Sequence, residues 1–412
     1  MEHIYKIAFF VVVSFSFVFN QVLSYLNNKS SPLKIPSKLR DFYNQEKYSR
    51  SLQYKSEHYK LERMNSWMGF IVTLGLLLTG GFGFINQVLL DFGLSGRALS
   101  LAYFGVLFFL NDAISLPFSL YSTFVIEEKF GFNTSSFRIF IIDKLKSYAL
   151  GIIIGGLFLY VFLAIIHGLG SSFWIYGWMI LTVISLLVNF LYVRLFLPIF
   201  NKIEPLPSGD LKTAIETLAE KLDFPLRQIM VMDASKRSAK SNAFFSGFGR
   251  QKTIVLYDTL LEKFSNEELV GILAHEVGHY KKKHIYTNMI STSLLSGVTL
   301  LVLSWFIFSE DLSIALGENQ IYYHLNLIAF GILYKPINTI SSLFGNYISR
   351  KHEYEADEFA VRYCDKGVYK NALKKLSTEN LSDLSPHPYF VFAYYSHPTV
   401  LQRISAIDEN NQ

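Results

Sequence analysis

Long apolar runs separated by polar loops are the dominant pattern of this chain. Each run is near or above the ~20 residues needed to cross the hydrocarbon core of a bilayer. We identify seven candidate spans, at 5–26, 69–90, 99–122, 147–168, 173–200, 288–308 and 322–347. The pattern predicts a mainly α-helical, multi-pass integral membrane protein whose first run is retained as a span.

The polar loops predict how the spans are oriented. Lysine and arginine gather in the loops 27–68 and 123–146. In a seven-span topology these two loops lie on the same side as 201–287 and 348–412. Because cytoplasmic loops carry the Lys/Arg excess, we expect that side to be cytoplasmic.

The same pattern divides the chain into four parts. Residues 1–200 would hold five transmembrane helices with basic cytoplasmic loops, and 288–347 would hold the last two. Between them, 201–287 reads as a small cytoplasmic α+β segment, and 348–412 is a cytoplasmic C-terminal segment. This polar region has an amphipathic helix, two β-like runs and a capped helix, predicted at 210–222, 229–233, 253–257 and from about 266.

Composition agrees with a membrane protein and excludes some partners. Charged residues make up 17% of the chain, against roughly 25% in soluble domains. The net charge of +5 is modest and no long basic block lies outside the membrane flanks, so we expect membrane lipids and no nucleic acid as partners. The single cysteine, Cys364, excludes an internal disulfide and a cysteine-based metal site.

The motif that carries chemistry is His275-Glu-Val-Gly-His279, within the predicted capped helix. Residues four apart share one helix face, so both imidazoles can bind one Zn²⁺. Glu276 is one step further round the helix and can act as a general base without ligating the metal. A chain this long carries such a motif by chance on the order of 1–2% of the time, and the capped amphipathic helix strengthens the prediction.

A catalytic zinc needs a third protein ligand, and the best candidates follow the last span. Glu353 and Asp357 are four residues apart on one predicted helix face, so one could ligate zinc while the other supports a ligand histidine. The alternative is an exposed acidic face. His352 is a rival ligand that points away from this face. Glu355, Glu358 and His284 are expected to be solvated or interfacial.

Together these motifs resemble the type I CAAX prenyl protease family. Further segments fit the pattern of that family in the same order, at 124–129, 205–207, 241–245, 255–260 and 395–398, so that the resemblance covers about 40 to 408. Two features depart from it: the tail 408–412 has no recognisable endoplasmic-reticulum retention signal, and the loop 309–321 is short.

The resemblance implies a fold and a reaction. It implies seven helices around a large water-filled chamber, and removal of the last three residues after a prenylated cysteine. We therefore assign one zinc per chain to His275, His279 and Glu353, with Asp357 supporting a ligand.

The resemblance also implies how the substrate is held. Asn242, Ala243 and Phe244 would bind a peptide as an added edge strand. Arg403 would join them in binding substrate, and His397 would be catalytic, hydrogen-bonding the tetrahedral oxyanion. Zinc would lower the pKa of a water toward ~7, while Glu276 accepts its proton and passes it to the leaving amine.

Two rival functions remain open at this point. The first is a membrane quality-control zinc protease that cleaves unstructured peptides without a lipid requirement. The second is a seven-span transporter or receptor with an incidental motif. We expect a monomer in either the endoplasmic reticulum membrane or a bacterial inner membrane.

Overall fold

The computed structural model describes residues 2–30, 35–41, 43–247 and 252–409. Most of the first two thirds of the chain is helical. The helices before the sheet are α1 (Glu2–Lys29), α2 (Gln45–Leu78), α3 (Gly81–Asp91), α4 (Gly96–Tyr121), α5 (Phe137–Leu150), α6 (Gly156–Leu169), α7 (Phe173–Leu191) and α8 (Leu197–Phe200). Three π-helical segments, Ser122–Glu127, Gly151–Gly155 and Tyr192–Phe196, continue α4, α5 and α7.

The later helices surround a small sheet and complete the membrane part. They are α9 (Asp210–Lys221), α10 (Asp258–Lys263), α11 (Asn266–Lys281), α12 (His284–Phe306), α13 (Glu310–Ala315), α14 (Tyr323–Leu333), α15 (Lys335–Tyr363), α16 (Lys366–Glu379), α17 (Pro388–Tyr394) and α18 (Val400–Glu409). The sheet strands are β1 (Ile203–Pro205), β2 (Leu226–Met232), β3 (Ala243–Ser246) and β4 (Lys252–Tyr257). The helix and strands predicted at 210–222, 229–233 and 253–257 are therefore present within a few residues.

The described residues contain four helical segments long and apolar enough to span a membrane, or six if each of two bent helix pairs is one span. The bent pairs are α2 with α3 and α14 with α15, with bends of 69° and 53°. All seven predicted runs fall on these segments. Two of them, 147–168 and 173–200, lie within the continuous segment Phe137–Phe200, which is interrupted at Gly170, where φ is +51°.

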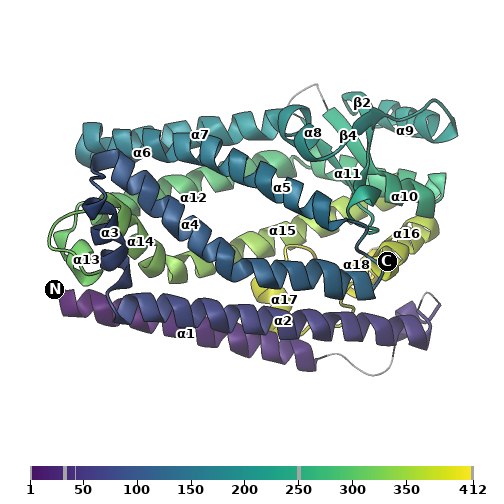
Figure 1. The fold of residues 1–412 in the computed structure, drawn as a ribbon. Helices are drawn as coiled ribbons and strands as arrows, with labels where there is room; N and C mark the ends of the chain where they lie inside the picture. Colours follow the sequence, from purple (N-terminus) through teal and green to yellow (C-terminus); the bar gives the residue numbers. More distant parts are fainter. Residues whose placement is uncertain (1, 31–34, 42, 248–251, 410–412) are drawn as a thin grey trace.

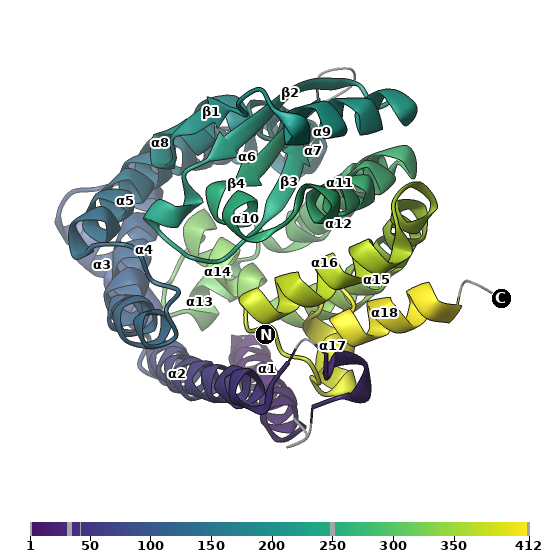
Figure 2. The same ribbon diagram turned by 90° about the vertical axis from the view of Figure 1, so that its right-hand side faces the viewer.

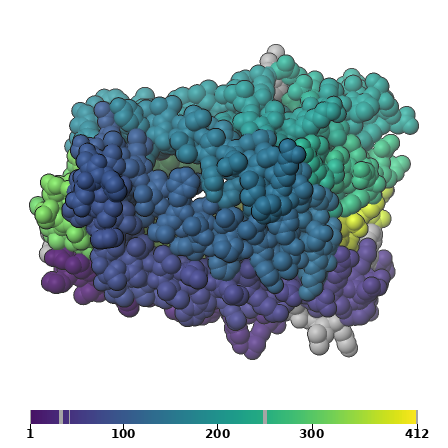
Figure 3. Space-filling model, viewed as in Figure 1, coloured from purple at the N-terminus to yellow at the C-terminus, as the bar shows by residue number. Residues whose placement is uncertain are grey.

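The helices form an elongated bundle with the sheet at one end. Figure 1 shows the sheet, α10, α16 and α18 at that end, and α3, α13 and the N-terminus at the other. Seen from the sheet end, the long helices are arranged in a ring (Figure 2). On the face formed by the blue segments, the space-filling surface is hollowed and opens into the interior (Figure 3).

The sheet leaves one strand edge available to a further strand. Its order is β1-β2-β4-β3, with β2 and β4 parallel and the other two pairs antiparallel. Strand β3 is therefore at the margin, and no described strand pairs with its outer edge. The inner face of the sheet packs with α9, α11 and α16 in one hydrophobic core.

Close packing of α11 against α15 brings the two halves of the motif together. The capping box predicted at Ser265 and Glu268 is present and starts α11. Further along, a Cβ added at Gly278 would lie 3.1 Å from the backbone of Ala356. A larger residue would fit only if the facing helix moved by a few tenths of an ångström, so glycine at the fourth position of the motif favours the close approach of the helix of the histidines to the helix of Glu353.

Candidate metal centre

Three side chains from α11 and α15 converge on one point. The Nε2 atoms of His275 and His279 are 3.1 Å apart, and each lies within 3.4 Å of a carboxylate oxygen of Glu353. For a tetrahedral metal with ligand bonds of 2.0–2.1 Å, neighbouring ligand atoms should be separated by about 3.3 Å. These residues, the one such group found in the described part of the chain, therefore fit a metal ion.

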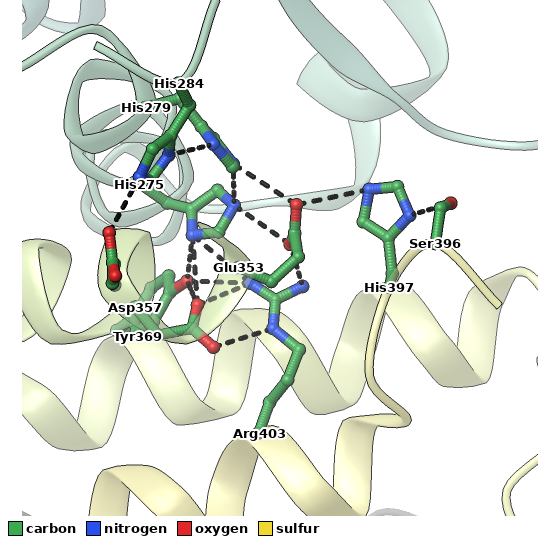
Figure 4. A network of polar contacts seen from close by, with 10 residues as sticks. His275, His279, His284, Glu353, Asp357, Tyr369, Ser396, His397 and Arg403 are labelled. Carbon is green, nitrogen blue, oxygen red and sulfur yellow. Dashed lines mark hydrogen bonds and ion pairs between the residues drawn. The ribbon is translucent and has the colours of Figure 1, made fainter. Parts of the chain in front are cut away.

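Burial supports the same assignment. His275 and Glu353 are 7% and 4% exposed. The Glu353 Oε2 atom is buried and has no hydrogen-bond partner among the described residues; its one cationic neighbour is Arg403, at 3.5 Å. A buried carboxylate oxygen without a hydrogen bond is costly unless a nearby cation compensates it. The side chain is thus held ready for a cation (Figure 4).

A second layer of side chains holds His275 by its other nitrogen. Its Nδ1 atom lies 3.0 Å from Oδ1 of Asp357 and 3.0 Å from the Tyr369 hydroxyl. Arg403 donates to both oxygens of Asp357, from Nε at 2.8 Å and from a terminal nitrogen at 2.5 Å. Asp357, at 1% exposure, is thus the centre of a buried network that orients His275.

His279 is held in a different way. Its Nδ1 atom is 3.0 Å from Nδ1 of His284, whose Nε2 is 3.0 Å from Oε2 of Glu355. His284 is 3% exposed and its ring stacks on that of His352 at 3.9 Å between centroids. His284 is therefore buried rather than interfacial, whereas Glu355 keeps 33% of its side chain exposed while it contacts His284.

The predicted catalytic groups line the same cavity as the ligands. This cavity has a volume of 510 Å³, and Glu276, His397, Asn242, Ala243 and Phe244 are on its walls. Burial raises the pKa of Glu276, while the two neighbouring imidazoles oppose that shift. A raised pKa brings a carboxyl group closer to the range in which it both accepts and returns a proton at neutral pH.

His397 approaches the centre from the loop before α18. Its Nε2 atom is 3.3 Å from Oε1 of Glu353, and its Nδ1 is 2.9 Å from the Ser396 hydroxyl. The side chain is 65% exposed, so one face of the imidazole is open to the cavity. Its Nε2 therefore lies beside the ligand carboxylate, where the N–H can donate in the plane of the ring.

The residues predicted to bind substrate divide into two groups. Ala243 and Phe244 are in edge strand β3, with Asn242 directly before it, and the amide oxygen of Asn242 accepts from the Ala243 nitrogen at 2.8 Å. Arg403 also reaches the cavity wall, yet its guanidinium is committed to Asp357. A second cavity, of 640 Å³, shares Phe244, Glu276 and His279 with the first.

Comparison with known proteins agrees with this geometry. Residues 24–202 match the family model described as CAAX prenyl protease N-terminal, five membrane helices, and residues 205–411 match peptidase family M48. The fold and the site thus define an integral-membrane metallopeptidase, and the interpretation as a transporter or receptor with an incidental motif is wrong.

Individual relatives narrow the assignment. The chain is 34% identical to CAAX prenyl protease 1 of Saccharomyces cerevisiae, over 95% of this chain and 92% of the relative. It is 32% identical to the human CAAX prenyl protease 1 homolog, over 87% and 86%. The crystal structure of S. mikatae Ste24p superposes with a TM-score of 0.93 at 30% identity, covering 98% of this chain and 99% of that one. The chain therefore belongs to the CAAX prenyl protease 1 family.

Proposed function

We propose that this protein is a zinc metalloendopeptidase that removes the last three residues from prenylated CAAX proteins. The names of the relatives support the substrate class, since proteins called CAAX prenyl protease 1 cover nearly the whole chain at 30–34% identity in yeast, human and nematode. One observation carries the proposal: the ligand cluster and the free edge of β3 share one cavity. A peptide added to that edge would pass beside the ligands.

Zinc is the metal that the donor set favours. Two imidazoles and one carboxylate, with separations near those of a tetrahedron, are typical of catalytic zinc sites in peptidases. When bound, zinc supplies Lewis-acid activation of a water and of the scissile carbonyl. His275, His279 and Glu353 would hold one ion per chain.

The proton transfers fall to Glu276 and the oxyanion to His397. Glu276 lines both cavities beside the ligands, so its carboxylate can accept a proton from the attacking water and return it to the leaving amine. His397 can donate a hydrogen bond to the oxyanion through the N–H of Nε2, the ring nitrogen that lies beside Glu353. Both groups line the cavity that contains the ligands.

Substrate would be held as an added strand. The outer edge of β3 offers backbone N–H and C=O groups to an extended peptide. Asn242 lies at the start of this edge, where its amide can reach the same peptide. We assign Arg403 to the support of the metal centre rather than to substrate, because its guanidinium already contacts Asp357, Tyr369 and Glu353.

The membrane arrangement would serve a lipid-modified substrate. We propose seven spans, with Phe137–Phe200 crossing twice because Gly170 breaks it between α6 and α7. The ring of helices in Figure 2 and the hollow surface in Figure 3 support a chamber. The basic loops favour a cytoplasmic site, and the eukaryotic relatives favour the endoplasmic reticulum membrane over a bacterial inner membrane. We expect a monomer.

Cleavage of matched peptides tests the proposal. Purified protein should release the C-terminal tripeptide from a farnesylated CAAX peptide, lose this activity to a zinc chelator and regain it when zinc is added back. The Glu276→Gln variant is the control for a contaminating protease. Equal cleavage of the unprenylated twin would instead favour the quality-control protease, and cleavage of neither peptide by zinc-loaded protein would overturn the function.

A further inference from the structure

A tight turn places an additional histidine beside the metal centre. Helix α11 ends at Lys281, and α12 begins at His284 only three residues later. Between them Lys283 has φ +61°, in the left-handed region that side chains other than glycine rarely adopt. Such a conformation is strained and persists when the surroundings over-determine it. Here the turn brings the His284 ring against His279.

With Glu355 ionised and His284 neutral, the hydrogen bonds from Glu355 inward give one assignment of protons. A carboxylate accepts, so the Nε2–H of His284 must donate to Oε2 of Glu355 at 3.0 Å. The Nδ1 of a neutral His284 is then an acceptor. The facing Nδ1 of His279, also at 3.0 Å, must therefore be the donor. This leaves the lone pair of His279 on Nε2, the atom that faces His275 and Glu353.

His352, which packs behind His284, takes no part in these hydrogen bonds. The ring of His352 lies parallel to His284, with 9° between the planes. Its Nδ1 atom is buried and has no hydrogen-bond partner in the part of the chain that the structure describes. His352 thus fixes the plane of the His284 ring by stacking alone, without joining the chain of hydrogen bonds.

We propose that His284 and Glu355 are a positioning pair that selects the metal-binding tautomer of His279 and holds its ring in place. The inference rests on the proposed zinc site. It gives each ligand histidine its own carboxylate: Asp357 acts directly on His275, and Glu355 acts on His279 through His284. Both carboxylates come from α15, the helix that supplies the ligand Glu353. This one helix therefore provides the third ligand and a supporting carboxylate for each histidine.

The rate of zinc release into excess chelator tests the pair without reference to catalysis. His284→Phe keeps a planar ring but removes the acceptor, and should release zinc 10–100-fold faster, as expected when an outer partner of a ligand is lost. His284→Asn places an amide oxygen near the former Nδ1 and should restore part of the difference. Glu355→Gln should have a smaller effect than His284→Phe, because its amide oxygen still accepts.

His352→Phe is the matched control, since it preserves the stacked ring and should release zinc at the wild-type rate. If His284→Phe released zinc no faster than the wild type, or if His352→Phe released it equally fast, the inference would be overturned. If His284→Phe fails to fold, His284→Asn and Glu355→Gln still test the inference. Zinc release at the wild-type rate in both of these variants would overturn it. A wild-type protein that binds no zinc would overturn the proposed function itself.

Discussion

Replacing Asp357 with asparagine removes a charge at the centre of the His275 support and preserves the shape of the side chain. Asp357 is 1% exposed and receives two hydrogen bonds from Arg403, at 2.8 and 2.5 Å, and one from Tyr369 at 2.5 Å. Removing one partner of a buried ion pair costs about 3–5 kcal/mol, because the other charge remains buried. We expect a loss of stability of that size.

The effect on the metal should be smaller and separable. The loss of an outer hydrogen-bond partner typically weakens metal binding 10–100-fold, which is about 1.4–2.7 kcal/mol. Competition with a chelator gives the apparent zinc affinity, and thermal unfolding of the zinc-free protein gives the stability. Asp357→Asn should lower both, since Arg403 loses its two charge-assisted hydrogen bonds to Asp357 whether or not metal is bound.

A double-mutant cycle with Arg403→Met decides whether the pair acts as a unit. Arg403→Met removes the charge but keeps an apolar chain of similar reach. Residues in one ion-pair network couple by about 0.5–3 kcal/mol, so the double variant should cost at least ~1 kcal/mol less than the sum of the single variants. If the losses of stability in the two single variants added to that of the double variant within ~0.5 kcal/mol, the Asp357–Arg403 pair would not be the cause of the destabilisation.

Four further predictions follow from the same geometry. Glu276→Gln should keep its zinc and lose turnover by 10²–10⁴-fold or more; loss of zinc, measured as metal content beside turnover, would assign it a structural role instead. Glu353→Ala should lose zinc and activity together. A Glu353→Ala variant that kept its metal would instead make Asp357 the third ligand. Gly278→Ala should destabilise by about 1–3 kcal/mol, because a Cβ would meet the facing helix at 3.1 Å, and unchanged thermal unfolding would contradict that contact. Cysteines at Ser208 and Asn410, in a cysteine-free background, should be labelled only from the cytoplasmic side, and labelling of both from the exterior would reverse the topology.

The sequence was informative wherever a local rule decides the structure. The helix of His275 and His279 follows from a capping box and an i, i+4 spacing, both of which act within one helix. The short strands followed from apolar β-branched runs bounded by turn residues. The membrane class followed from composition alone, because no soluble core requires apolar runs of that length.

The parts that the sequence did not reveal depend on contacts between distant segments. Tyr369 lies on α16 and Arg403 on α18, and neither has a spacing relation to His275. His284 lies only five residues after His279, but it follows three lysines and seemed to belong to a basic membrane flank. Its role depends on the left-handed turn at Lys283, which no residue type at that position indicates.

The positions of Asp357 and Glu355 show how helix α15 can affect all three metal ligands. Glu353, Glu355 and Asp357 are spaced along little more than one turn of α15, so a single rotation or shift of this helix moves the third ligand and both histidine supports together. Close packing at Gly278 opposes that motion by locking α15 against α11. Separation of this helix pair would therefore remove the third ligand and both histidine supports in one step. Weakening the α11–α15 contact should weaken retention of the metal, whereas replacing one supporting side chain should weaken only the ligand that it holds.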